Sequence, residues 1–215
     1  MNGTFMFGED RFGDAEDYSE YYREIGGQLP DIEINALIHD IYDYLNVRYP
    51  DEKYRHAFPA LVDAINSVME QEFTNEEIEK IVDTFSFHEH GHIPDEYVDA
   101  LFLLSEHFIL SLVIDIWSPK QRWLKTFDDS GISSIISASS FSSDHGIVKP
   151  SPKPFDYVVQ QLNLSKESCL VIGDSIRRDL GGSIACSIDC VLVGGSQDER
   201  AFSTYRNLLE LCDDI

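Results

Sequence analysis

The sequence is poor in basic residues. Its 215 residues include 16 Lys and Arg against 39 Asp and Glu, which gives a formal net charge of −23. Such a charge repels phosphate backbones and anionic lipid head groups, so we expect neither a nucleic-acid nor a membrane partner. A divalent cation suits the excess of carboxylates, and one local basic site can still hold a small anionic substrate.

Cysteines are also few, and long apolar runs are missing. Cys169, Cys186, Cys190 and Cys212 form no Cys-x-x-Cys pair, and we interpret them as reduced thiols of a cytoplasmic protein. No run of about 18 apolar residues predicts a membrane span. The N-terminal residues lack the basic flank and apolar run of a secretory signal. We therefore predict a cytoplasmic location, and the sequence leaves the oligomeric state open.

Two parts of the chain differ in their hydrophobic period. Within residues 15–92, apolar side chains recur at helical spacing, and Thr74 with Glu77 forms a capping-box pattern. The helical segments expected there are 29–50, 57–73 and 74–87. From residue 93 onward, short apolar strands alternate with helical segments. The expected strands are 108–115, 133–139, 168–174 and 188–195, and the expected helices are 94–107, 118–132, 151–164, 176–185 and 198–215.

Apolar strands that alternate with helices predict a parallel sheet covered on both faces. We therefore predict an α/β core formed by residues 1–14 and 93–215, with an all-helical cap subdomain over residues 15–92. Ligands of such sheets bind at the carboxyl ends of the strands.

Two carboxylates follow the strand 168–174 in the segment GDSIRRD. Asp174 ends the strand, and Asp179 follows one helical turn later. Neighbouring carboxylates repel each other unless a cation or a shared proton lies between them, and Mg²⁺ prefers oxygen ligands of this kind. The alternative is structural: Asp174 caps the next helix, and Asp179 pairs with Arg177 or Arg178.

Lys149 directly precedes Pro150 in a loop before a predicted helix. A lysine held there is a fixed cation, and a fixed ammonium near a carboxylate pair suits the binding of a phosphoryl group and its metal. The alternative is an ordinary solvated lysine.

These segments resemble motifs of the haloacid dehalogenase-like (HAD) hydrolases. GIVKP (146–150) and GDSIRRD (173–179) look like the family's third and fourth motifs, and MNGT (1–4) looks like the end of its D-x-D-G-T first motif. The resemblance covers most of the chain and implies a three-layer, Rossmann-type parallel sheet with a helical cap. It implies Asp174 as a direct Mg²⁺ ligand, Asp179 as a supporting acid of the metal site, and Lys149 as the residue that steadies the nucleophile and the phosphoryl group.

Three positions depart from the family pattern. The aspartyl nucleophile would stand two residues before Asn2, ahead of Met1; we expect the chain start to be truncated or wrongly assigned, with a gap left between strands. Asn2 takes the place of the acid–base aspartate, and an amide cannot transfer that proton. Where the family has Ser or Thr, we place Ile114, or Asp115 if the register shifts by one residue.

Four further residues are candidates for substrate binding. Gly3 and Thr4 follow Asn2 in the first motif. Arg11 is the candidate contact for a substrate anion, with a salt bridge to its acidic neighbours as the alternative. Ser118 is a candidate to replace the hydroxyl that the second motif lacks.

Three histidines alternate in the segment HEHGH. In an extended segment, His88, His90 and His92 would share a face and could chelate a transition metal. We prefer to interpret the segment as a polar hinge between cap and core.

The sequence thus predicts a Mg²⁺-dependent phosphatase of a small phosphorylated metabolite that acts through an aspartyl-phosphate, with Asn2 and Lys149 at catalytic positions. The alternative is a catalytically impaired HAD-like protein that binds Mg²⁺, a ligand or a partner, which Asn2 and Ile114 favour. A 2-haloacid dehalogenase is less favoured, because the tandem acids indicate metal and phosphate.

Overall fold

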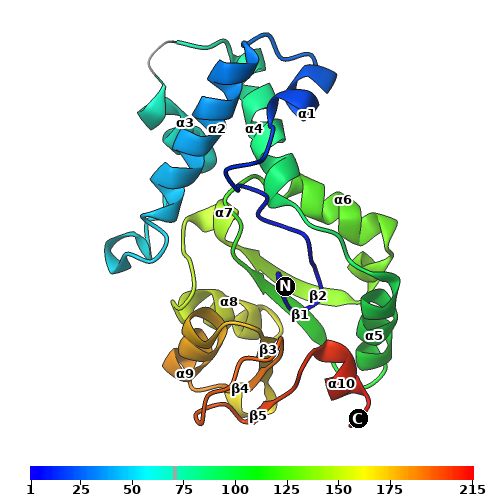
Figure 1. The fold of residues 1–215 in the computed structure, drawn as a ribbon. Helices are drawn as coiled ribbons and strands as arrows, with labels where there is room; N and C mark the ends of the chain where they lie inside the picture. Colours follow the sequence, from blue (N-terminus) through cyan, green and yellow to red (C-terminus); the bar gives the residue numbers. More distant parts are fainter. Residues whose placement is uncertain (70–71) are drawn as a thin grey trace.

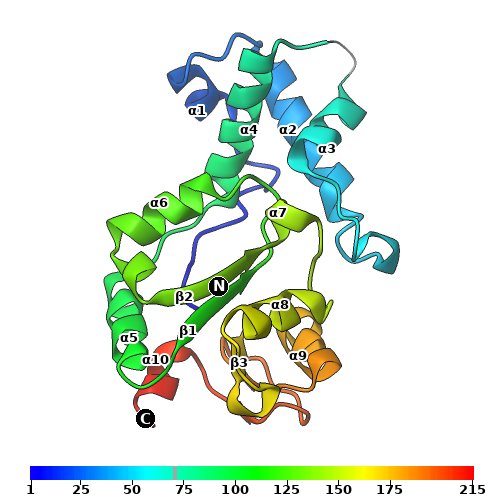
Figure 2. The same cartoon turned by 180° about the vertical axis from the view of Figure 1, so that it is seen from behind.

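The computed structural model describes residues 1–69 and 72–215, and it shows a helical lobe above an α/β lobe (Figure 1). Residues 70 and 71, within the segment 57–73 that the sequence predicts to be helical, lie outside the described residues. The chain starts in the α/β lobe and then crosses into the helical lobe, as the rear view also shows (Figure 2).

The helical lobe is built around one long amphipathic helix. Ile34, Ile38, Ile41 and Leu45 recur at three- and four-residue spacing and are fully buried against the neighbouring helices. Thr74 accepts the backbone N–H of Glu77 at 3.2 Å, so the predicted cap forms. The elements of this lobe are α1 (Ser19–Glu24), α2 (Asp31–Asn46), the 3₁₀ turn η1 (Glu52–Tyr54), α3 (Leu61–Val68) and α4 (Asn75–Glu89).

The strands of the lower lobe form two separate parallel sheets. The first pairs β1 (Leu110–Ile114) with β2 (Ile136–Phe141), and the second has the order β3 (Leu170–Gly173), β4 (Asp189–Leu192), β5 (Ser203–Thr204). Within residues 1–69 and 72–215, no strand pairing joins β1 to β3. All four predicted strands form, and Phe5 and Met6 pack in one apolar cluster with residues of β1 and β4.

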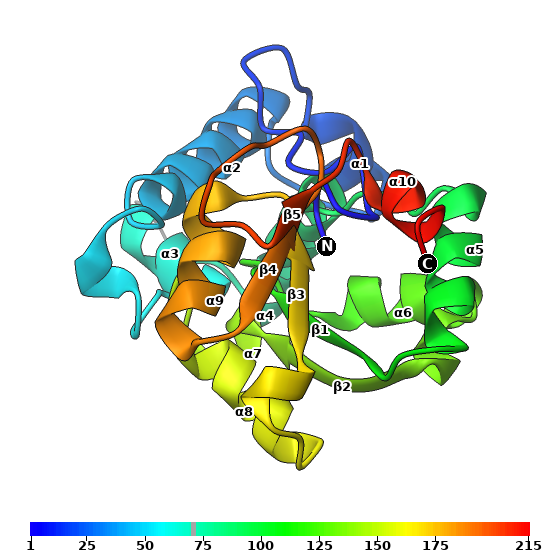
Figure 3. The ribbon, with the colours of Figure 1, turned by 90° about the horizontal axis from the view of Figure 1, so that it is seen from below.

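Helices cover the strands on two faces, which gives three layers (Figure 3). Leu112 and Ile114 of β1 pack in one apolar cluster with α5, α6 and α10, whereas Val113 packs against α8 and α9. Successive strand residues thus face opposite helical layers. The helices are α5 (Asp95–Ser105), α6 (Gln121–Asp129), α7 (Ser142–His145), α8 (Lys153–Gln161), α9 (Gly181–Cys186) and α10 (Leu208–Cys212).

Two antiparallel chain segments, 7–12 and 88–92, connect the lobes. Phe7 and His92 exchange backbone hydrogen bonds of 2.9 and 2.8 Å, and the N–H of Arg11 donates to the carbonyl of His88 at 2.9 Å. At Gly91 a Cβ atom would lie 2.5 Å from the Phe7 carbonyl oxygen, so only glycine allows this close approach. We call this pair of segments the hinge.

The predicted helix 198–215 is wrong over its first half. Ser203 and Thr204 instead form β5 beside β4, and α10 begins only after Asn207, whose side chain accepts the N–H of Glu210 at 2.9 Å. Pairing with the exposed edge of β4 overrides the helical period here. The predicted helix 176–185 is split into the π-helical turn η4 (Ile176–Leu180) and α9, and α7 was not predicted.

Two further sequence expectations concern cysteines and membrane spans. All four cysteines are free thiols, and Cys186 and Cys190 are buried. In the part of the chain that the structure describes, no helix has both the length and the apolar character needed to cross a membrane.

Candidate functional site

A cavity of about 250 Å³ lies between the two lobes, at the carboxyl ends of β1 and β3. This is the edge where ligands of parallel α/β sheets bind. Its walls come from the first residues of the chain, the hinge, the end of α2, and the loops after β1 and β3. The lining residues are Met1, Asn2, Gly3, Glu9, Asp10, Tyr42, Asn46, Tyr49, Glu89, Ile114, Asp115, Trp117, Lys149, Asp174, Arg178 and Asp179.

The first residues of the chain contact Asp174. Thr4 is buried and donates its hydroxyl to Oδ1 of Asp174 at 3.3 Å. Gly3 has φ +70°, and a Cβ there would lie only 2.8 Å from Oδ2 of Asp174. Glycine is required at this position both for its backbone conformation and for the close approach. The structure thus brings the segment MNGT to the carboxylate of GDSIRRD, as the sequence predicts.

Lys149 and Asp179 form a buried ion pair. Lys149 Nζ lies 2.7 Å from Oδ1 of Asp179, and both side chains are only 8% exposed. The other oxygen of Asp179 accepts the N–H of Ser175 at 3.0 Å. Burial alone would raise the pKa of Asp179, but the Lys149 ammonium, the N-terminal ammonium and the N–H of Ser175 together outweigh it and lower the pKa to about 2. Burial likewise disfavours the Lys149 ammonium, but Asp179 and Asp115 outweigh it and raise its pKa.

The donor set of the cavity fits Mg²⁺ with few protein ligands. Asp179 has both oxygens bonded, so its part is to hold Lys149, whereas Asp174 keeps Oδ2 free of any described partner. Oδ1 of Asn2 and Oε2 of Glu9 are buried in the same cavity without a hydrogen-bond partner among the described residues. Unpartnered buried oxygens call for a donor or a cation.

The same residues do not form a multi-carboxylate or histidine metal centre. In residues 1–69 and 72–215, no three His, Cys, Asp or Glu side chains are grouped so as to hold a metal. Mg²⁺ keeps several waters and is usually bound by one or two carboxylates and a substrate phosphate, which suits a site centred on Asp174.

The structure places both candidates for the second-motif position, Ile114 and Asp115, at the cavity. Ile114 is 2% exposed and its side chain packs in the apolar cluster under α5 and α6. Asp115, the shifted alternative, is the residue whose carboxylate is fixed in the site: Oδ2 accepts the hydroxyl of Tyr49 at 2.7 Å and the N–H of Lys149 at 3.0 Å. Of the two candidates, Asp115 is therefore the one that presents a polar group, and that group is an acid.

Ser118 does not line the cavity, and its polar groups are already bonded. Its N–H donates to Glu89 Oε2 at 2.9 Å and its hydroxyl to the same oxygen, while the N–H of Trp117 donates to Oε1 at 2.5 Å. Glu89 comes from the end of α4, so this carboxylate ties the hinge to the loop after β1. Burial raises the pKa of Glu89 to about 7, although the bonds from Ser118 and Trp117 oppose the shift. This placement does not support Ser118 as a substrate contact.

Arg11 also lies outside the cavity lining. Its guanidinium donates to the carbonyl oxygens of Gly8 at 2.9 Å, of His90 at 3.0 Å and of Phe87. Among the described residues Arg11 forms no salt bridge, so that predicted alternative is not found, and its guanidinium stabilises the hinge; this placement does not support Arg11 as a substrate contact. The arginine that lines the cavity is Arg178, which the sequence suggested only as a partner for Asp179.

The three hinge histidines point in different directions. His88 is 4% exposed and packs edge-on against Tyr18, while His90 packs against Trp123 and its Nε2 lies 2.9 Å from the Thr126 hydroxyl. The predicted alternative of a histidine metal site therefore does not form among the described residues.

Sequence reasoning missed Tyr49 and Glu89 and underestimated Arg178. Tyr49 follows α2 in a segment that looked like a plain amphipathic helix, and Glu89 stands between the conspicuous histidines. The only sequence signal for Arg178 was its position directly before Asp179 in the fourth motif.

Comparison with known proteins identifies the family. The model of the haloacid dehalogenase-like hydrolases matches residues 1–186. Similar solved structures include a 2-haloacid dehalogenase from Pseudomonas syringae pv. Tomato DC3000, with a TM-score of 0.63 and 16% identity over 98% of this chain and 93% of that one. A HAD phosphatase from Thermococcus onnurineus has a TM-score of 0.57 and 18% identity over 92% and 85% of the two chains.

A third similar structure is that of YfnB from Bacillus subtilis, assigned as a HAD-hydrolase and determined bound to magnesium. It has a TM-score of 0.56 and 18% identity over 91% of this chain and 88% of that one. No functionally curated protein matches the chain in sequence at a significant level. At these identities the solved structures show a shared fold, and the family model shows the relationship. This chain belongs to the haloacid dehalogenase-like hydrolases.

Proposed function

We propose that the cavity binds Mg²⁺ and the phosphoryl group of a small metabolite, as part of a Mg²⁺-dependent phosphohydrolase. The observation that carries the proposal is the presence, in one cavity, of Asp174 with a free carboxylate oxygen and of the buried Lys149–Asp179 pair. A cavity of about 250 Å³ suits a small substrate. The similar phosphatase and the magnesium-bound structure are consistent with this assignment.

The residues have distinct parts in this proposal. Asp174 would hold Mg²⁺, and Thr4 fixes the orientation of its carboxylate. When bound, Mg²⁺ neutralises charge on the phosphoryl oxygens. Lys149 presents a second positive charge at a fixed place, since Asp179 and the carbonyl of Val113 hold its ammonium. Fixed charges stabilise a phosphoryl group without reorganisation during the reaction.

A second candidate function is binding without turnover, and two residues favour it. Asn2 stands at the acid–base position, where its amide cannot exchange a proton. Asp115 stands where a hydroxyl would hold a phosphate oxygen, and its carboxylate repels that oxygen instead. General acid–base catalysis typically contributes about 10²–10⁴-fold in rate, so its loss alone would leave slow hydrolysis.

Hydrolysis of 4-nitrophenyl phosphate with Mg²⁺ distinguishes these functions. The assay is run on residues 1–215 and on any longer chain that the gene encodes upstream, each beside its Asp174→Ala variant. Turnover that Asp174→Ala abolishes supports the phosphohydrolase. Mg²⁺ binding that depends on Asp174, without turnover in either chain, supports the binding protein. Release of halide from 2-chloropropionate in parallel samples would instead support a dehalogenase.

A further inference from the structure

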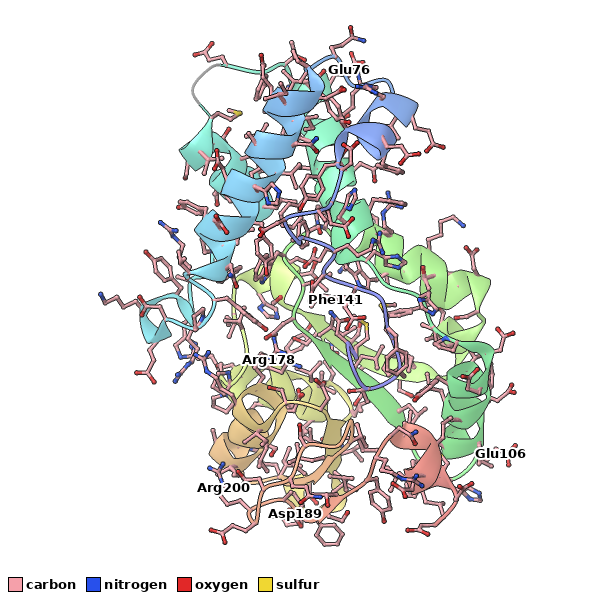
Figure 4. All side chains as sticks on the ribbon, viewed as in Figure 1. Glu76, Glu106, Phe141, Arg178, Asp189 and Arg200 are labelled. Atoms are coloured by element: carbon pink, nitrogen blue, oxygen red, sulfur yellow. The ribbon has the colours of Figure 1, made fainter. Side chains whose placement is uncertain are left out.

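Arg178 lines the cavity but has no part in the proposed binding of Mg²⁺ and the phosphoryl group. It belongs to η4, and its backbone N–H and its Nε both donate to the hydroxyl of Ser175, at 3.2 and 3.3 Å. These bonds hold the backbone N–H and the Nε atom of Arg178 in place, and the residue lines the cavity. In Figure 4, Arg178 lies on the edge of the α/β lobe that faces the helical lobe.

The guanidinium of Arg178 is incompletely paired. Among the described residues, its hydrogen bond to the helical lobe is a long one of 3.4 Å from Nη1 to the hydroxyl of Tyr49, whose ring centre lies 5.5 Å from Cζ. The charges of Asp179 and Asp174 also act on the guanidinium, but no carboxylate of the described residues lies within 4.0 Å of it. Asp115 is bonded to Tyr49 and Lys149 instead. A guanidinium carries five N–H donors in a fixed fork, so donors remain for a ligand.

The position of Arg178 indicates which part of a ligand it meets. Lys149 and Asp174 line the cavity at the strand ends, where we place the phosphoryl group, and Tyr49 is a lining residue that comes from the helical lobe. Arg178 contacts Tyr49, so it lies on the part of the cavity that the helical lobe borders, where we place the rest of the substrate. A fork of donors there suits a planar or tetrahedral anion.

We infer that Arg178 binds a second anionic group of the substrate, a carboxylate or a second phosphate, on the leaving-group side of the cavity. The inference rests on the proposed function, because the phosphoryl position defines the leaving-group side. It narrows the substrate class from phosphate monoesters in general to small esters that carry another anion. Arg178 is then a specificity-determining residue.

Two phosphonates that cannot be hydrolysed test the inference without turnover. Benzylphosphonate and 4-carboxybenzylphosphonate are titrated calorimetrically, with Mg²⁺, into residues 1–215, Arg178→Met and Arg177→Met. Arg177 is the matched control: it carries the same charge one residue earlier, is exposed, and donates to the carbonyl of Pro50 outside the cavity lining. Arg178→Lys keeps the charge without the fork, and serves if the methionine variant does not fold.

We expect the unmodified chain to prefer the phosphonate that carries the additional carboxylate. The carboxylated ligand should bind about tenfold or more tightly than benzylphosphonate, as a charge-assisted bond provides. Arg177→Met should keep this preference, Arg178→Lys should reduce it, and Arg178→Met should abolish it.

Equal affinities of the two ligands for the unmodified chain would overturn the inference and leave the proposed function standing. An equal loss for both ligands in Arg178→Met would also overturn it, since Arg178 would then serve the phosphoryl group. If neither ligand binds with Mg²⁺, the proposed function fails and the inference fails with it.

Discussion

The hydroxyl of Tyr49 donates a 2.7 Å hydrogen bond to Oδ2 of Asp115, and this bond joins the helical lobe to the loop after β1. The same oxygen accepts the N–H of Lys149 at 3.0 Å, so one carboxylate connects three walls of the cavity. Burial, followed by the charge of Asp115, raises the pKa of Tyr49 well above its usual value. Tyr49 therefore remains a hydrogen-bond donor at neutral pH.

Replacing Tyr49 by phenylalanine removes this bond and leaves the ring in place. We expect Tyr49→Phe to lower the free energy of unfolding by about 1–3 kcal/mol, the usual contribution of a hydrogen bond to a charged group. Denaturant unfolding measures the loss, and hydrogen exchange should show faster opening of residues 47–58. Tyr44→Phe, at the end of the same helix, is the matched control, since no described residue bonds its hydroxyl. Equal losses in the two variants would contradict the assigned contact.

Gly3 tests the contact between the first motif and Asp174. In Gly3→Ala the new Cβ would meet Oδ2 of Asp174 at 2.8 Å and push the carboxylate away, so Mg²⁺ affinity should fall by about tenfold or more. Gly26→Ala is the control: its φ of +83° imposes similar backbone strain, but nothing lies within 4 Å of the added Cβ. Both variants should lose stability, and only Gly3→Ala should lose Mg²⁺ affinity in a calorimetric titration. If Gly3→Ala and Gly26→Ala changed the Mg²⁺ affinity to a similar extent, the contact between Gly3 and Asp174 would have no part in metal binding.

Lys149 stabilises the buried charge of Asp179. Lys149→Met leaves that carboxylate without its cation, and breaking a buried pair in this way costs about 3–5 kcal/mol of folding free energy. The double variant Lys149→Met/Asp179→Leu removes both charges and should be more stable than Lys149→Met in urea unfolding. If the double variant is no more stable than the single one, the pair does not carry the energy assigned to it.

Glu89 makes a pH-dependent contribution to stability. Its pKa of about 7 in the folded protein exceeds the ordinary glutamate value of 4.5, so between these pH values the folded state binds more protons than the unfolded state. Stability due to Glu89 is therefore full below pH 4.5 and is lost as the pH rises through 7. One pKa unit corresponds to about 1.4 kcal/mol, so a rise from 4.5 to about 7 limits this contribution to about 3.5 kcal/mol.

Glu89→Gln removes the titrating group and keeps one acceptor oxygen, which can serve the amide of either Trp117 or Ser118. We expect the difference in unfolding free energy, wild type minus variant, to decrease from pH 4.5 to pH 7. Urea unfolding at several pH values measures it. A difference that stays constant or grows over this range would show that Glu89 is ionised throughout.

Much of the fold follows from local patterns in the sequence. The strands 108–115 and 168–174 are short and apolar between helical segments, so their parallel pairing and their covering helices could be predicted, although the choice of partners could not. The proximity of Lys149, Asp174 and Asp179 was also predictable, because the carboxyl ends of parallel strands meet at one edge.

The remaining site features depend on contacts between distant segments, which no local pattern reveals. Arg11 resembled a free cation, but folding places three backbone carbonyls of the hinge around it. Ser118 offered a hydroxyl, but Glu89 from α4 occupies it. The orientations of Ile114 and Asp115 depend on where β1 ends, and a one-residue change of register exchanges the buried and the cavity-facing side chain.

The central claim is that Asp174 holds Mg²⁺ beside a phosphoryl group in the cavity. The most direct test titrates benzylphosphonate into residues 1–215 and into Asp174→Asn, each with and without Mg²⁺. Asp174→Asn keeps the size of the side chain and can still accept the Thr4 hydroxyl, so the fold should persist. We predict that Mg²⁺ tightens phosphonate binding by at least about tenfold in the unmodified chain and has no effect in Asp174→Asn. The claim would be contradicted if Mg²⁺ left the affinity for benzylphosphonate unchanged in the unmodified chain, or if it changed that affinity equally in both proteins.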